Sequence, residues 1–269
     1  ASALAHASTT LHKSDLERKT LLDEALEHGM HAFEMNPVEP FHCTTIAKIL
    51  SHMGRDKDAL EVFNEAIERA PQLSTFYAQK GRHLFKMKRF TEATEAYHRA
   101  IQIEETNSKQ DWTQLLFELA THLFLEARNM TGAAYWYKET VMADPTYVDA
   151  WLNLGLTQTK THGHEAAVLS FEQGLAVPDC HRVGRLNQAK GRSLANLGRY
   201  EEAVAAFREG AAGAVREREP IVDTVLSDLG DALLTLGRAA EAAEVYQEAM
   251  QGRPTPQLRA KLQRAREEL

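Results

Sequence analysis

One local pattern recurs along the chain with a period close to 34 residues: an alanine followed four positions later by an aromatic side chain. The alanines are Ala25, Ala59, Ala93, Ala133, Ala167, Ala203 and Ala242, at intervals of 34, 34, 40, 34, 36 and 39 residues. The residue four positions on is aromatic after every alanine except Ala25, where it is Gly29. Seven copies in phase indicate a repeat architecture, in which each copy is one supersecondary unit.

The spacing within each copy predicts a pair of helices. The alanine, the aromatic residue and a mostly small residue seven positions after the alanine share one face of a helix. A further, mostly small residue twelve positions before the alanine lies on a preceding helix, where it lets the two backbones approach closely. These earlier residues are Ala47, Gly81, Thr121, Gly155, Gly191 and Gly230. Pro37, Pro71, Pro145 and Pro254 end four of the units, because proline cannot continue a helix. We therefore expect an all-α chain of stacked antiparallel helix pairs, which is an α-solenoid.

The unit resembles the tetratricopeptide repeat. The best single match consists of Trp151, Leu154 and Gly155 on the first helix, followed by Ala167 and Phe171 on the second. The resemblance covers about residues 6 to 254, in seven units. It implies a right-handed superhelix with a concave inner face that the first helix of each unit lines. It also implies that the chain binds other macromolecules rather than catalysing a reaction.

Departures from the period define the predicted boundaries. Residues 1–13 are expected to be an N-terminal tail or an incomplete first helix, followed by a helix at Asp15–Met35. The array covers residues 14–254, and its units are about 6–39, 40–73, 74–113, 114–147, 148–183, 184–222 and 223–254. The longest interval predicts an exposed loop at 104–111, and the next longest predicts a longer helix or a loop at 212–220. The leucines among charged residues in 255–269 predict a C-terminal capping helix, which an array end requires.

The composition narrows the classes of partner. The net charge of −7 disfavours nucleic acid, whose binding depends on neutralising phosphates, so RNA binding by the repeats is a weaker alternative. No apolar run approaches the roughly 20 residues of a membrane-spanning helix, and no membrane insertion is expected. Cys43 and Cys180 cannot form a disulfide framework. We expect a cytoplasmic location, with organellar and secretory locations left open because the sequence begins at Ala1 rather than at a methionine.

No catalytic or cofactor-binding motif is recognisable in the sequence. The chain lacks a glycine-rich phosphate loop, a nucleophile elbow and an HExxH motif. His162 and His164 flank Gly163 in a predicted polar turn, but two histidines without a third ligand do not define a metal site. We therefore expect no enzymatic activity, no cofactor and no metal. Asn129 begins an N-glycosylation sequon in a predicted exposed turn, and Trp136 is a candidate surface contact.

The candidate partner-binding residues follow from the resemblance, which places groove-lining positions on the first helix of each unit. They are Lys48, Arg82, Phe85, Lys86, His122, Asn153, Arg185, Arg192 and Asn196. Several are basic, so the groove is expected to attract an acidic or carboxylate-bearing segment. The carboxylate clamp of chaperone-binding members is incomplete, since Glu118 and His122 stand where its first pair belongs. Only Asn153 fits the asparagine ladder of glycosyltransferase-type arrays.

These features favour a protein–protein interaction scaffold or adaptor, acting alone or as a subunit of a larger complex. The alternative is the non-catalytic, substrate-presenting repeat region of a longer enzyme, such as a glycosyltransferase or a hydroxylase. The fold by itself does not distinguish these two functions.

Overall fold

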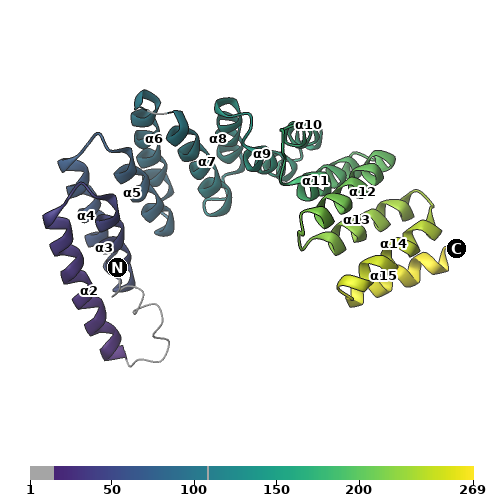
Figure 1. The fold of residues 1–269 in the computed structure, drawn as a ribbon, viewed down its shortest axis with the longest axis horizontal. Helices are drawn as coiled ribbons and strands as arrows, with labels where there is room; N and C mark the ends of the chain where they lie inside the picture. Colours follow the sequence, from purple (N-terminus) through teal and green to yellow (C-terminus); the bar gives the residue numbers. More distant parts are fainter. Residues whose placement is uncertain (1–14, 108) are drawn as a thin grey trace. The chain divides into compact units, whose positions relative to one another are not determined.

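The computed structural model describes residues 15–107 and 109–269, which form helices joined by short turns, with no strand among them (Figure 1). The helices group into two compact units, one ending at Ala127 and the other beginning at Arg128. Within each unit, consecutive helices pack against one another as antiparallel pairs. The predicted all-α solenoid is confirmed, whereas the tail predicted at 1–13 lies outside the described residues.

The described helices of the first unit are α2 to α7. Their bounds are α2 Asp15–Met35, α3 Pro40–His52, α4 Asp56–Arg69, α5 Ser74–Lys86, α6 Phe90–Asn107 and α7 Lys109–Leu125. The helix predicted at Asp15–Met35 is confirmed. The exposed loop predicted at 104–111 is wrong, because α6 continues to Asn107 and α7 begins at Lys109. The inserted residues lack glycine and proline and include glutamates, glutamine and lysine, which readily extend a helix.

The second unit contains α8 to α15. Their bounds are α8 Met130–Ala143, α9 Val148–Lys160, α10 His164–Leu175, α11 Val183–Asn196, α12 Tyr200–Arg216, α13 Val222–Thr235, α14 Ala239–Gly252 and α15 Pro256–Glu267. Of the two alternatives for 212–220, the longer helix is the better description, since α12 continues to Arg216. The last described helix, α15, buries Leu258 and Leu262 in the core that α13 and α14 share.

The packing inside a helix pair explains the small residue that lies twelve positions before most of the repeat alanines. A Cβ atom placed on Gly155 of α9 would lie only 2.3 Å from the ring of Phe171 on α10. The aromatic ring therefore occupies the space that a side chain would need, and this close approach requires glycine. The same contact joins Gly81 to Tyr97, Gly191 to Phe207 and Gly230 to Tyr246.

The turn between the two helices of a pair also repeats. One residue, five positions before the repeat alanine, has a left-handed backbone. These residues are Gly54, Lys88, Arg128, His162, Gly198 and Gly237. In the polar turn predicted at this point, the left-handed residue is His162, with a φ of 61°, whereas Gly163 is the N-cap of α10 with a φ of −84°. The histidine thus occupies a position that favours glycine.

Candidate partner-binding groove

The nine candidate residues are divided between the two compact units. Lys48, Arg82, Phe85, Lys86 and His122 belong to the first unit, and Asn153, Arg185, Arg192 and Asn196 belong to the second. The four in the second unit line two adjoining hollows, so the fold brings this group together. Lys48 and Lys86 are exposed on α3 and α5 of the first unit.

In the first unit, Arg82 on α5 forms an ion pair with Glu118 on α7. On the same helix, Nδ1 of His122 lies 2.8 Å from Oε1 of Glu126, and its Nε2 lies 3.8 Å from Oε1 of Glu118. Burial opposes protonation of His122, but hydrogen bonds to the two carboxylates raise its pKa above the ordinary value. Burial also opposes ionisation of Glu118, yet the bonds from His122 and Arg82 lower its pKa to about 2. These four side chains therefore form their ion pairs and hydrogen bonds with one another.

Phe85 is not a surface residue, which corrects its assignment to the groove. Its side chain is 0% exposed. The ring stacks on the imidazole of His122, with the centroids 4.7 Å apart and the planes 11° from parallel, and it also contacts Tyr97. Phe85 lies on the inner helix as predicted, but its ring packs between α5, α6 and α7 and is closed to a partner.

The larger hollow of the second unit, of about 560 Å³, lies along α9 and α11. Leu152, Leu156 and Ile221 provide an apolar strip, and the side chain of Leu156 is 36% exposed. Polar groups beside this strip are Asn153, Thr159, Lys160, Arg185, Gln188 and Arg192. An apolar strip edged by amides and cations can hold an extended peptide through one apolar side chain and one carboxylate.

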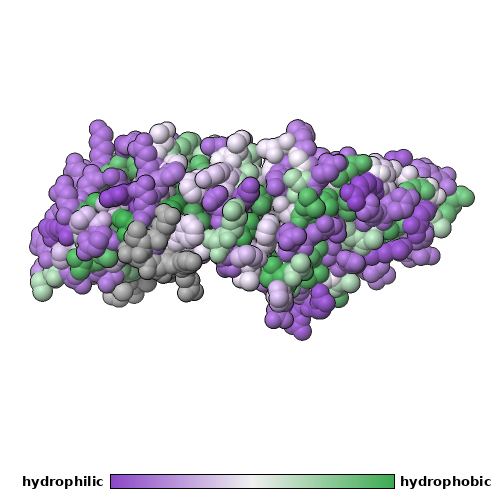
Figure 2. All heavy atoms as spheres, turned by 90° about the horizontal axis from the view of Figure 1, so that it is seen from above, coloured by the Kyte–Doolittle hydropathy of each residue, from purple (hydrophilic) through white to green (hydrophobic). Residues whose placement is uncertain are grey.

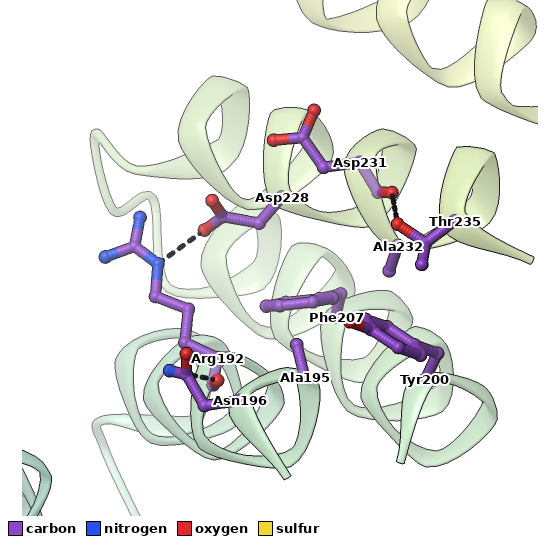
Figure 3. Close-up of a pocket in the computed structure, with 9 residues that line it drawn as sticks. All are labelled: Arg192, Ala195, Asn196, Tyr200, Phe207, Asp228, Asp231, Ala232 and Thr235. Carbon is purple, nitrogen blue, oxygen red and sulfur yellow. Dashed lines mark hydrogen bonds and ion pairs between the residues drawn. The ribbon is translucent and has the colours of Figure 1, made fainter. Parts of the chain in front are cut away.

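The smaller hollow, of about 290 Å³, continues from the first across α11 to α13. Figure 3 shows Arg192 on one side with its guanidinium directed at Asp228, and Tyr200 and Phe207 on the other side. Asn196 lies beside Arg192 and donates a hydrogen bond to the backbone carbonyl of Arg192 at 3.0 Å. Since Arg192 lines both hollows, α9, α11 and α13 together form one inner groove.

The two arginines of this groove are paired with acids that lie farther along the chain. The distance is 3.2 Å from Nε of Arg185 to Glu219 and 2.8 Å from Nε of Arg192 to Asp228. Gln188 also donates to Asp228, at 2.8 Å. The two arginine side chains keep about half of their surface exposed, so a ligand carboxylate can approach the same guanidinium groups. Lys160, in contrast, has no ion pair in the described part of the chain.

Sequence reasoning missed the acid that pairs with Arg192. Asp228 was not recognised, although it follows Arg192 by 36 residues, about one repeat. Glu118 follows Arg82 by the same 36 residues, and the two are also paired. Opposite charges one repeat apart on inner helices were therefore an available signal for these pairs.

The remaining sequence features have structural roles. The side-chain oxygen of Asn129 accepts a hydrogen bond from the backbone N–H of Gly132 at 2.9 Å, and Asn129 is exposed in its turn as predicted. Trp136 is half-buried, whereas its neighbour Tyr135 is 56% exposed. Among the described residues, no cluster of three histidine, cysteine or acidic side chains could hold a metal ion. Nor does any described helix combine the length and apolar character that crossing a bilayer requires.

The sequence has recognisable relatives. The tetratricopeptide repeat profile matches residues 189–257 and 43–73. The small glutamine-rich tetratricopeptide repeat-containing protein 2 of Mycosarcoma maydis is 29% identical over 83 residues, which are 31% of this chain and 24% of that protein. The match thus spans about a quarter of the curated relative.

Several solved structures share the fold. The C-terminal part of a tetratricopeptide repeat-containing protein from Cytophaga hutchinsonii has a TM-score of 0.69 at 13% identity, covering 96% of this chain and 98% of that one. YrrB, a tetratricopeptide repeat protein with an unusual peptide-binding site, has a TM-score of 0.57 at 16% identity, with coverages of 76% and 99%. The Naa15/Naa10 complex bound to HypK gives 0.54 at 18% identity, with coverages of 99% and 39%.

The chain contains tetratricopeptide repeats. Two of its segments match the family profile, and the glycine–aromatic contact found in the matched segment at 189–257 also joins helix pairs outside it. Its architecture is that of a protein-interaction scaffold. Proteins of this family are generally non-catalytic interaction modules.

Proposed function

We propose that the second unit binds an extended segment of a partner protein in the groove formed by α9, α11 and α13. The observation that carries this proposal is the apolar strip of Leu152, Leu156 and Ile221 lying beside Lys160 and Arg185. A partly exposed leucine in a groove favours burial of an apolar side chain from a partner. The adjoining cations favour a carboxylate close to that side chain.

The acidic character of the segment rests on three cations. Lys160 is exposed and unpaired within the described residues, so it can accept a ligand carboxylate without breaking an internal contact. Arg185 and Arg192 keep their side chains 47% and 55% exposed despite their pairing. A ligand carboxylate therefore competes with Glu219 and Asp228, and binding should weaken as salt concentration rises.

A role as a subunit of a larger assembly is compatible with this groove. The Naa15/Naa10 structure contains a chain of similar fold within a complex, and YrrB is described by its peptide-binding site. We infer that the present chain likewise acts by holding a partner, and that the groove of the second unit makes the main contact.

A matched peptide array tests the proposal. Each acidic peptide, with one central apolar residue, is compared with a peptide in which every Asp and Glu is replaced by Asn or Gln. We expect the full chain to prefer the acidic members. Lys160→Glu should weaken that binding about tenfold or more, which corresponds to roughly 1.4 kcal/mol.

Arg259→Glu is the control, because Arg259 is an exposed cation on α15 and its replacement changes the net charge equally. This variant should bind as the unmodified chain does. Equal binding of acidic and amide peptides would overturn the acidic preference. Equal losses from Lys160→Glu and Arg259→Glu would overturn the assignment to this groove.

A further inference from the structure

The carboxylate of Glu219 is held inside the protein, at a point where the fold supplies both a cation and a helix N-terminus. Its side chain is only 10% exposed, and its Oε1 lies 3.2 Å from Nε of Arg185. The face drawn in Figure 2 is largely hydrophilic, so exposed polar groups are common on this chain and do not by themselves mark a site. A buried glutamate is rare, because partners must replace the water that its charge loses. The partners of Glu219 therefore define a position that can hold a carboxylate.

The second partner of Glu219 is the first turn of α11. Oε2 of Glu219 lies so close to Gly184 that a Cβ atom placed on this glycine would overlap the oxygen. The first turn of α11 contains no acid, and among the described residues the N-cap, Arg182, makes no capping hydrogen bond with its side chain. The N–H groups of a first turn lack partners within the helix and attract anions. Glu219 supplies that anion from a later part of the chain.

The length of α12 explains how Glu219 reaches α11. This helix has 17 residues, whereas α8, α10 and α14 have 14, 12 and 14. Its last turn lies against the beginning of α11, and a Cβ atom on Gly213 would be only 2.9 Å from the backbone nitrogen of Gly184. The turn that follows brings Glu217 to α11 as well, where its Oε1 accepts a hydrogen bond from the N–H of Val183 at 3.3 Å. The longer helix thus places two carboxylates at one helix N-terminus.

The contact that holds Glu219 is incomplete. Its Oε2 is buried but has no hydrogen-bond partner within the part of the chain that the structure describes. A buried oxygen without a partner costs free energy, which favours release of this side chain into water. The backbone does not need to move with it, since the N–H of Glu219 donates to the carbonyl of Ala214 at 2.8 Å. Rotation of the Glu219 side chain is therefore enough to vacate the position.

Arg185 connects this position to the groove. Its side chain is 47% exposed and lines the larger hollow, so a carboxylate from a segment in that hollow can reach the guanidinium. Once Glu219 has turned away, the same carboxylate also faces the first turn of α11. The charge of Arg185 and the N–H groups of the helix N-terminus then attract the same group.

We propose that Arg185 and the first turn of α11 form a carboxylate subsite, which Glu219 fills until a carboxylate of the partner replaces it. The inference rests on the proposed function, because the replacing group belongs to the segment held in the groove. Glu219 is then an internal competitor that lowers the affinity of the groove for acidic segments. A segment without a carboxylate at this point leaves Glu219 in place and gains nothing from the subsite.

Removal of the competing charge tests the subsite in the full chain. Glu219→Gln keeps the size of the side chain, and we expect it to strengthen binding of the acidic peptides about three- to tenfold, with no gain for their amide counterparts. Glu217→Gln is the matched control, because Glu217 lies in the same turn and accepts its hydrogen bond from the Val183 backbone. It should leave the peptide affinity nearly unchanged. Equal effects of the two variants, while Lys160→Glu still weakens binding, would overturn the subsite and leave the groove assignment standing.

Acetate tests the subsite without any peptide. Glu219→Ala removes the carboxylate and the methylene group beside it, which are the atoms that acetate replaces. At neutral pH, acetate should raise the melting temperature of this variant above its value in chloride of the same ionic strength, because a ligand of the folded state stabilises it. The unmodified chain, whose subsite is filled, should show no such difference. Circular dichroism measures both. Equal melting temperatures of Glu219→Ala in acetate and in chloride would overturn the proposal, whatever the peptide array shows.

Discussion

His162 holds a left-handed backbone conformation at a turn position where three other repeats have glycine. A side chain with a Cβ atom is strained there, whereas glycine is not. We expect His162→Gly to stabilise the chain against urea by about 0.5–1 kcal/mol. Gly198→Ala makes the opposite change at the equivalent position, where φ is 76°. Apart from the adjacent residues, no heavy atom would lie within 4 Å of the added Cβ, so the backbone conformation alone decides the effect. It should destabilise the chain by about 1 kcal/mol, and a neutral effect of both variants would contradict the strain.

His122 makes the stability of the first unit depend on pH. Burial lowers its pKa in the folded state, but hydrogen bonds to the carboxylates of Glu118 and Glu126 outweigh this effect and raise it. The rings of Phe85 and Tyr97 are its other neighbours. A raised pKa stabilises the fold fully below the unfolded value, about 6.5, and this stabilisation is lost as pH rises through the folded value.

We expect His122→Gln to destabilise the chain more at about pH 6 than at about pH 8. These two pH values bracket the range in which histidine ordinarily changes its charge. Urea unfolding of both proteins at the two pH values measures the difference. The pKa of Glu118, about 2, places its own titration well below this window. If the two proteins differ in free energy of unfolding by the same amount at both pH values, His122 contributes only packing.

Individual site residues could be predicted only in part. The repeat register correctly placed Asn153, Arg185, Arg192 and Asn196 on inner helices, and these four line the hollows. The register could not reveal that the ring of Phe85 turns inward, because that depends on the imidazole that the next repeat places against it.

At the scale of the helix pair, Gly155 and Phe171 form one packing unit. In an exposed helix, Gly→Ala is stabilising, since glycine has the larger backbone entropy. Here we expect Gly155→Ala to destabilise the chain by about 1–3 kcal/mol, because its Cβ would overlap the Phe171 ring. A double-mutant cycle with Phe171→Leu should give less than the sum of the two single effects. Additive effects, or stabilisation by Gly155→Ala alone, would contradict this packing.

Helix pairs could be predicted because small and aromatic residues recur at fixed spacing, and this spacing survives variation elsewhere. The insertion at 104–111 could not be placed by the same reasoning. A longer interval shows only that residues have been added, and here they lengthen α6 and α7 instead of forming the predicted loop.

Neighbouring inner helices are joined by the pairing of Arg192 with Asp228. Asp228→Asn keeps an acceptor for Gln188 but removes the charge that competes for the arginine. We expect this variant to bind acidic peptides more tightly, by roughly three- to tenfold, which is about 0.7–1.4 kcal/mol. Fluorescence anisotropy with the peptides of the array measures the change. Unchanged or weaker binding would mean that Arg192 does not contact the ligand.

At the scale of the whole chain, the proposed binding surface lies on the inner helices α9, α11 and α13 of the second unit.

Photo-crosslinking determines whether the partner segment lies in the groove of α9, α11 and α13. Asn153 in the groove and Glu244 on an outer helix are each replaced, in separate full-length chains, by the photoreactive residue p-benzoylphenylalanine. Each chain is then irradiated with the tightest acidic peptide of the array. We predict a covalent adduct from position 153, suppressed by excess unlabelled peptide, and none from position 244. An adduct from position 244, or bound peptide that never crosslinks to position 153, would contradict binding in the groove.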